Sequence, residues 1–163
     1  MTPERINPIR DTDDAARAMA RGVLDGARTA ALAVIDPDTG GPYVSRIAFG
    51  RAPDGDCLGL LSDLSRHARA LAADPRASLL LGEPGMKGDP LTHPRLTLQV
   101  TAQPLTGDAA RARLRQIWLA MHPKSTLYVD FADFRFYRFR IDAAHLNGGF
   151  GKAYALDEKD LTI

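Results

Sequence analysis

Clusters of turn-forming residues cut this chain into short segments and leave little room for long helices. The cluster Asp36-Pro37-Asp38-Thr39-Gly40-Gly41 separates an apolar run at 29–35 from a second run at 42–50, which predicts a β-hairpin. The turn Pro53-Asp54-Gly55 precedes another apolar run at 57–62. Further strands are expected at 76–82, at 95–103, where apolar and polar residues alternate, at 134–141, and after the glycines at 148, 149 and 151.

The same pattern predicts few helices. Acidic and capping residues before residue 15 favour a helix over 15–27, and two more helices are expected after Ser65 and over 108–121. At least six strands joined by short turns favour a closed antiparallel sheet, because closure removes exposed strand edges. We therefore expect a mainly β protein, a six- to seven-stranded antiparallel Greek-key barrel with peripheral helices. It forms one domain over 1–163, with residues 1–12 as a loose arm.

Composition excludes several classes of protein. The net charge of +1 gives no support for binding nucleic acid or a membrane surface. The arginines at 111, 113 and 115 do not change this, since a spacing of two scatters them around a helix. No apolar run approaches the roughly 20 residues that span a bilayer. The polar start of the chain is unlike a secretory signal, so we expect a soluble, cytoplasmic protein. The single cysteine, Cys57, is expected to serve packing.

The segment Ser62-Asp63-Leu64-Ser65-Arg66-His67-Ala68-Arg69 is the strongest candidate site. It follows an apolar strand, and Ser65 is placed to cap the helix that begins there. A helix start with free N–H groups, a hydroxyl group and two arginines can bind an anion such as a phosphate. A capped surface helix with solvated arginines explains the same residues, and both readings remain open.

Gly148-Gly149-Phe150-Gly151-Lys152 is the second candidate. Its glycines fit either a tight turn or the close approach of the backbone to a ligand. Lys152 has a charge that would suit a phosphate or a propionate, although a solvated lysine is equally consistent with the sequence.

No metal site is expected, because the four histidines are far apart and lack a second ligand at a suitable spacing. They are His67, His93, His122 and His145. A serine hydrolase is also not expected, since the chain has no Gly-x-Ser-x-Gly motif.

Several motifs in a fixed order carry a resemblance to a known family. They are Ser45-Arg46-Ile47-Ala48-Phe49, the segment 62–69, Asp74-Pro75-Arg76-Ala77-Ser78-Leu79-Leu80, Arg95-Leu96-Thr97-Leu98 and Leu146-Asn147-Gly148-Gly149-Phe150-Gly151-Lys152-Ala153. Over residues 17–155 the chain resembles the FMN-binding split-barrel superfamily of pyridoxamine 5′-phosphate oxidase. It is most similar to the branch of haem-iron-utilisation proteins.

The resemblance implies a split barrel that binds FMN and acts as an oxidoreductase, with catalytic residues unknown. Arg46 would lie beside the flavin ring, Ser62 near it, and Arg66 and His67 at its phosphate. The full set of expected cofactor-binding residues is Arg46, Ile47, Ala48, Phe49, Ser62, Ser65, Arg66, His67, Gly149 and Lys152.

Three departures from the oxidase pattern stand out. The first weakens the expected binding of the FMN phosphate, and the other two point away from pyridoxamine phosphate as the substrate. His67 replaces a lysine, Leu96 replaces a glutamine, and the oxidase's C-terminal arginine-rich signature is missing. The alternative is a haem-binding or haem-utilisation protein of the same fold that has lost the flavin site. Haem relatives use a histidine near the C-terminus as axial ligand, and this chain has none after His145.

The resemblance also implies a homodimer with the cofactor at the subunit interface and a small-molecule substrate that stays unidentified. A small barrel is filled by its own side chains, so FMN would lie outside it and need a second subunit as cover. We expect the aromatic residues of 134–137, with Trp118 and Tyr128, to supply that apolar interface. Arg46 and Arg66 of one chain would then face the aromatic or glycine-rich segment of the other.

Overall fold

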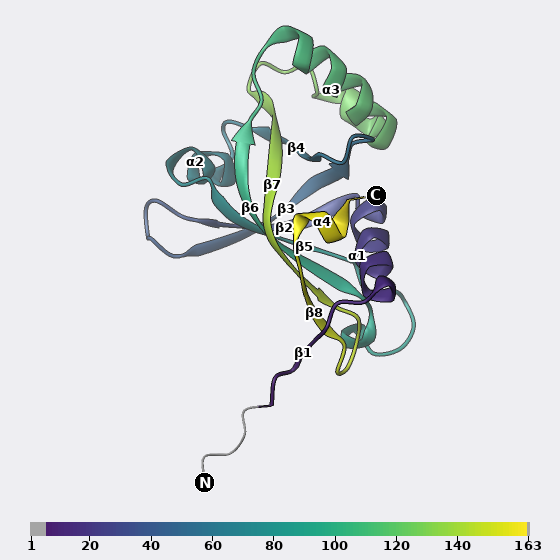
Figure 1. Ribbon diagram of the computed structural model, residues 1–163. Helices are drawn as coiled ribbons and strands as arrows, with labels where there is room; N and C mark the ends of the chain where they lie inside the picture. Colours follow the sequence, from purple (N-terminus) through teal and green to yellow (C-terminus); the bar gives the residue numbers. More distant parts are fainter. Residues whose placement is uncertain (1–5, 163) are drawn as a thin grey trace.

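The computed structural model describes residues 6–162 and consists of a β-barrel with helices at its ends and on one side (Figure 1). The elements in chain order are β1 (Ile9–Arg10), α1 (Asp14–Gly26), β2 (Thr29–Ile35), β3 (Pro42–Arg51), β4 (Cys57–Ser62), α2 (Arg66–Ala73), β5 (Arg76–Leu81), the 3₁₀ helix η1 (Pro90–Thr92), β6 (Arg95–Pro104), α3 (Asp108–Met121), the 3₁₀ helix η2 (Pro123–Leu127), β7 (Phe134–Asn147), β8 (Ala153–Leu156) and α4 (Glu158–Leu161).

Six strands close the barrel in the order β7-β4-β3-β2-β5-β6, and β6 pairs again with β7. Every pairing in this ring is antiparallel. β2, β3 and β4 follow one another as hairpins, and β5 returns past α2 to lie beside β2, which is a Greek-key connection. The expected antiparallel Greek-key split barrel is confirmed.

The strand expected over 134–141 is longer than predicted and continues to Asn147. One edge of β7 pairs with β6 from Tyr137 to Asn147. Its other edge pairs first with β4, from Phe134 to Arg138, and then with β8, from Ala144 onward. β7 therefore joins the barrel to the two strands outside it.

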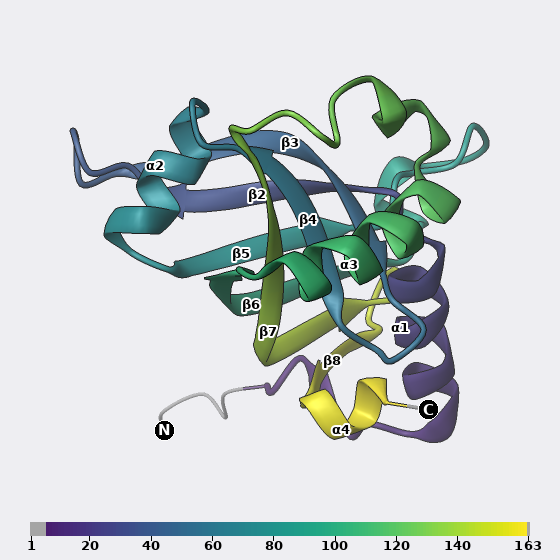
Figure 2. The same cartoon turned by 90° about the horizontal axis from the view of Figure 1, so that it is seen from above.

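The barrel core is closed at both ends by helices. Fully buried side chains from the strands, such as Leu32 and Leu98, pack with Leu24 of α1 and Leu71 of α2. Figure 2 shows α1 and α2 at opposite ends of the strands. Among residues 6–162, no helix is long and apolar enough to cross a bilayer. Cys57 is buried in this core, and burial raises the pKa of its thiol to about 12, so it serves packing as expected.

A second core lies between α3 and the outer side of β4 and β7. Trp118 is fully buried there, against Leu58 and Phe136. This corrects the expectation that Trp118 and the aromatic residues of 134–137 together form spare apolar surface, because the helix of the same chain already covers Trp118 and Phe136. Tyr128 and Phe134 stay partly exposed.

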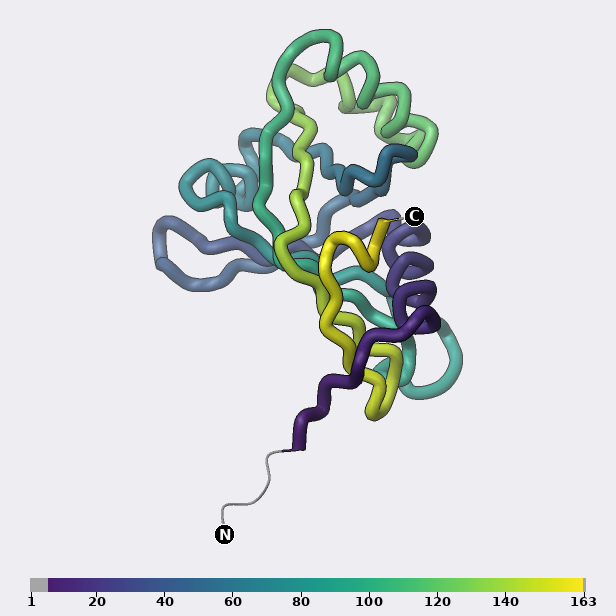
Figure 3. Tube along the Cα trace, in the orientation of Figure 1, coloured from purple at the N-terminus to yellow at the C-terminus, as the bar shows by residue number. Residues whose placement is uncertain are grey.

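Part of the expected N-terminal arm is attached to the barrel rather than loose. Ile9 and Arg10 pair in parallel with Ala153 and Tyr154 of β8. The hydroxyl of Thr12 donates a hydrogen bond of 2.8 Å to the carbonyl of Ala155. Figure 3 shows the purple start of the chain beside its yellow end. Residues 1–5 of the arm lie outside the described residues.

Gly59 of β4 has no room for a side chain, because a Cβ there would lie 2.8 Å from the buried ring of Phe139. We expect Gly59→Ala to lower the free energy of unfolding by about 1–3 kcal/mol, the usual cost of overpacking a core. The matched control is Gly22→Ala in α1, where nothing lies within 4 Å and alanine is the better helix former. This control should raise the free energy of unfolding by about 0.5–1 kcal/mol. Urea unfolding measures both, and a neutral Gly59→Ala would contradict this account of the packing.

Candidate functional site

β3 and β4 separate partway along the barrel and leave a pocket between them. The two strands pair only where Phe49–Arg51 face Cys57–Gly59. Beyond these residues β3 continues along β2, and β4 continues along β7. The facing edges of the two strands therefore carry backbone N–H and C=O groups available for a ligand or water. The pocket has a volume of about 240 Å³ and is lined by Arg46, Ile47, Ala48, Leu60, Leu61, Ser62, Ser65, His67, Tyr128 and Phe134.

The structure brings six of the ten predicted cofactor-binding residues together at this pocket. They are Arg46, Ile47, Ala48, Ser62, Ser65 and His67. Phe49 is fully buried in the barrel core instead. Gly149 and Lys152 belong to the turn between β7 and β8, where Lys152 N–H donates to the carbonyl of Gly149, and they do not line the pocket. Gly149 has a φ of +119°, so the turn itself requires glycine there.

The two serine hydroxyls at the pocket are engaged within the protein. Ser62 Oγ donates to Asp133 at 2.5 Å and accepts the N–H of Leu64. Ser65 caps α2 as predicted: its Oγ accepts the N–H of Ala68 and donates to the carbonyl of Ser62. These bonds fix the shape of the β4–α2 connection.

Arg66 is also engaged, although the phosphate role predicted for it is not tested by this finding. Its guanidinium donates twice to one oxygen of Asp36, at 3.1 and 2.7 Å, and lies over the ring of Tyr43. Asp36 is almost fully buried at the end of β2. The backbone N–H of Asp38 and the Arg66 guanidinium hold the pKa of Asp36 below its ordinary value, against the opposing effect of burial. The pair ties α2 to the β2–β3 turn.

His67 extends from the first turn of α2 into the pocket wall and is half-buried. Its Nδ1 lies 2.9 Å from the hydroxyl oxygen of Ser45, on β3. Burial lowers the pKa of His67, so the imidazole is neutral near pH 7. Ser45 is a residue that our sequence analysis did not assign to the site, although it begins the motif that contains Arg46.

Aromatic side chains form the opposite wall. The rings of Tyr128 and Phe134 lie 5.0 Å apart. The hydroxyl of Tyr128 accepts a hydrogen bond from buried Ser125, whose oxygen also accepts the indole N–H of Trp118. Tyr128 and the strand from Phe134 are predicted above to lie at a subunit interface, and within the single chain they line the pocket.

Arg46 is the polar side chain at the pocket that remains open. It is exposed on β3 and forms no side-chain hydrogen bond or ion pair with the residues described. Within 6–162, no three His, Cys, Asp or Glu side chains are grouped to hold a metal ion. The site therefore combines an unpaired cation, a neutral imidazole, strand edges and an aromatic wall, which suit a flat, largely apolar ligand with an anionic substituent.

The pocket in one chain is too small to enclose such a ligand. Its volume of about 240 Å³ lies below the range of about 300–1,000 Å³ that is typical of small-molecule sites. A ligand of cofactor size would extend out of it and need further cover.

Comparison with known proteins agrees with this architecture. The family model described as CREG, beta-barrel, matches residues 11–162. Among curated proteins, the chloroplastic non-canonical heme oxygenase HOZ of Arabidopsis thaliana is 32% identical over 153 residues. The alignment covers 92% of this chain but only 43% of HOZ, so the chain spans less than half the length of this relative.

Two of the solved structures that share this fold are a heme binding protein and a protein of the pyridoxinephosphate oxidase family. The heme binding protein from Mycobacterium smegmatis is 26% identical, with a TM-score of 0.80, over 94% of this chain and 61% of that one. A protein of the pyridoxinephosphate oxidase family from Clostridium acetobutylicum is 12% identical, with a TM-score of 0.70, over 93% of this chain and all of that one. The second likeness shows the fold alone. The resemblance to the split-barrel superfamily and its haem branch is confirmed.

The Asp36–Arg66 pair should make stability depend on pH. A carboxyl group whose pKa is lowered by folding contributes its full stabilisation above its ordinary pKa, here 3.8, and loses it as pH falls through the lowered value. We therefore expect Asp36→Asn to melt at a lower temperature than the wild type at pH 7. The difference should shrink below about pH 4. Thermal melts followed by circular dichroism across this range measure both effects.

Asp38→Asn is the matched control, since Asp38 is 72% exposed and lies 4.0 Å from the same guanidinium. It should melt close to the wild type at every pH. A constant difference between Asp36→Asn and wild type from pH 7 to pH 3 would contradict the role given to the Asp36 charge.

Proposed function

We propose that this chain, which belongs to the CREG β-barrel family, binds haem in the pocket between β3 and β4. The observation that carries the proposal is the presence of two groups at one pocket beside an aromatic wall. One is the neutral, half-buried imidazole of His67, and the other is the guanidinium of Arg46, which has no ion-pair partner among the described residues. Haem is flat and apolar with anionic propionates at one edge, and this set of groups matches that chemistry. The names of two relatives, a heme oxygenase and a heme binding protein, point the same way.

The residues of the pocket have distinct tasks in this proposal. Tyr128 and Phe134 would pack against the macrocycle and exclude water from one face. Arg46 would pair with a propionate, for which its fixed charge and fork of donors are suited. The bonds of Ser62 and Ser65 keep the β4–α2 connection in place around the ligand. Bound haem would supply redox chemistry at iron, tuned by the polarity of this pocket.

FMN is the second candidate, and the open strand edges favour it. Backbone N–H and C=O groups along β3 and β4 offer hydrogen bonds to the polar edge of a flavin ring, and FMN would supply electron or hydride transfer. The proposed phosphate side is the weaker part of this candidate. Arg66 is held by Asp36, and His67 is neutral, so a phosphate would have to displace an existing ion pair.

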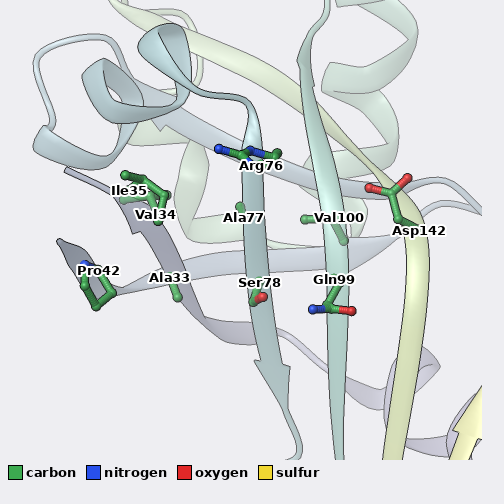
Figure 4. Close-up of a pocket in the computed structure, with 10 residues that line it drawn as sticks. All are labelled: Ala33, Val34, Ile35, Pro42, Arg76, Ala77, Ser78, Gln99, Val100 and Asp142. Atoms are coloured by element: carbon green, nitrogen blue, oxygen red, sulfur yellow. The ribbon is translucent and has the colours of Figure 1, made fainter. Parts of the chain in front are cut away.

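We further propose that a second copy of the chain covers the site. Apolar side chains are exposed on the outer side of β2, β3 and β5, where Val44 is 61%, Leu80 46% and Ile35 38% exposed. Arg46 shares this face with Val44, because side chains two apart on a strand point the same way. A hollow of about 450 Å³ continues over β2, β5 and β6 (Figure 4). A partner on this face would complete the small pocket at its edge.

Optical spectroscopy distinguishes the two cofactors. On adding hemin to the purified protein, we expect a saturable Soret band, and on adding FMN little quenching of flavin fluorescence at tens of micromolar. Arg46→Ala should weaken haem binding about tenfold, since a charge-assisted hydrogen bond is worth about 1.5 kcal/mol or more. Arg69→Ala is the control, because Arg69 is exposed on α2 but lines a different pocket.

Saturable FMN binding that Arg66→Ala weakens, without a Soret band on hemin addition, would support FMN and contradict haem. If Arg46→Ala and Arg69→Ala weakened haem binding equally, Arg46 would have no specific role in binding haem.

The proposed dimer can be tested by sedimentation velocity. A species of twice 17.7 kDa is expected for the wild type at micromolar concentration. Val44→Glu should convert it to monomer, because a buried unpaired carboxylate is costly at an interface. Met86→Glu is the control, since Met86 is fully exposed in the β5–β6 loop, outside this face. A wild type that sediments as a monomer with and without hemin would contradict the shared site.

A further inference from the structure

His67 is the histidine that the structure places at the pocket. His122 Nε2 lies 2.8 Å from the carbonyl of Phe49, and its ring packs on Trp118 with 4.3 Å between centroids. Both ring nitrogens of His93 are hydrogen-bonded within the loop before β6. His145 is exposed on β7 and does not line the pocket. Any imidazole contribution by the described chain to this pocket comes from His67.

The orientation of the His67 ring leaves one nitrogen available. Nδ1 is 2.9 Å from Ser45 Oγ, whereas Nε2 forms no hydrogen bond with the described residues. When Nδ1–H donates its hydrogen bond to the serine oxygen, Nε2 carries the free lone pair. A hydrogen bond from the other ring nitrogen is the usual device by which proteins fix the tautomer and direction of a metal-binding histidine.

The first turn of α2, which carries His67, is fixed by two further contacts. Ser65 caps α2 two residues before His67, and the Asp36–Arg66 pair ties the same turn of the helix to the β2–β3 hairpin. A solvated surface histidine would have neither constraint.

We infer that His67 Nε2 is the axial ligand of haem iron in this protein, an inference that rests on the proposed haem function. It gives the described chain an iron ligand from α2. Ser45 is then a positioning residue, because it acts on the iron through the His67 ring. The remaining pocket residue with a ligating group is Tyr128, whose hydroxyl is 3.1 Å from Ser125.

The experiment compares haem-reconstituted wild type with His67→Ala, His67→Gln and Tyr128→Phe. Optical absorption and electron paramagnetic resonance report the iron ligand, and equilibrium dialysis reports haem uptake. Both His67 variants should shift the Soret band and the resonance signals and lower haem affinity at least about tenfold. Added imidazole should restore the wild-type spectrum in His67→Ala, where the deleted ring leaves space. His145→Ala is the matched control and should leave spectra and affinity unchanged.

The outcomes separate the two proposals. Wild type that takes up haem while both His67 variants keep its spectrum overturns the ligand assignment and leaves haem binding standing. A spectral change in Tyr128→Phe alone overturns it in favour of the phenol. Wild type that takes up no haem overturns the proposed function itself. His67→Gln preserves a side chain that can bond to Ser45, so folded protein, checked by circular dichroism, is available for each comparison.

Discussion

The sharing of β7 among three strands determines the shape of this molecule. β7 gives one edge to β6 and divides the other between β4 and β8. β4 keeps its pairing with β7 over Leu58–Ser62, and β3 keeps its pairing with β2. The edge between β3 and β4 is paired only as far as Gly59, where the two strands part. The pocket is the space that this parting leaves. Backbone groups on its edges need partners, which is why a closed barrel has a place that favours a polar-edged ligand or water.

The strands could be predicted because local signals agree with the final structure. The turn cluster at 36–41 marks the β2–β3 hairpin, and alternation over 95–103 marks β6. The second half of β7 was missed, because Asp142-Ala143-Ala144-His145 has low strand propensity and is held by pairing with β6 and β8. The pairing of residues 9–10 with β8 could not be predicted either, because its partner strand is distant in the chain.

The site shows the same division between local and distant information. Ser62, Ser65 and His67 gather because one short motif carries them, so their proximity follows from sequence. The partner of Arg66 could not be predicted in this way, because Asp36 lies 30 residues away in a sequence typical of an ordinary turn. Likewise, surplus aromatic residues indicate an apolar surface, but only the packing of α3 determines that Trp118 is buried within one chain. Side-chain partners, more than backbone elements, depend on tertiary structure.

The two walls of the pocket belong to different hydrophobic cores. Ile47 and Leu61 pack in the barrel core, whereas Leu60, Tyr128 and Phe134 pack with the core under α3. Regions with separate cores can open with different free energies. A molecule bound between the walls would contact both units and oppose the opening of either one. Occupancy of the pocket would thus couple the barrel core to the core under α3, so that the two would unfold more cooperatively.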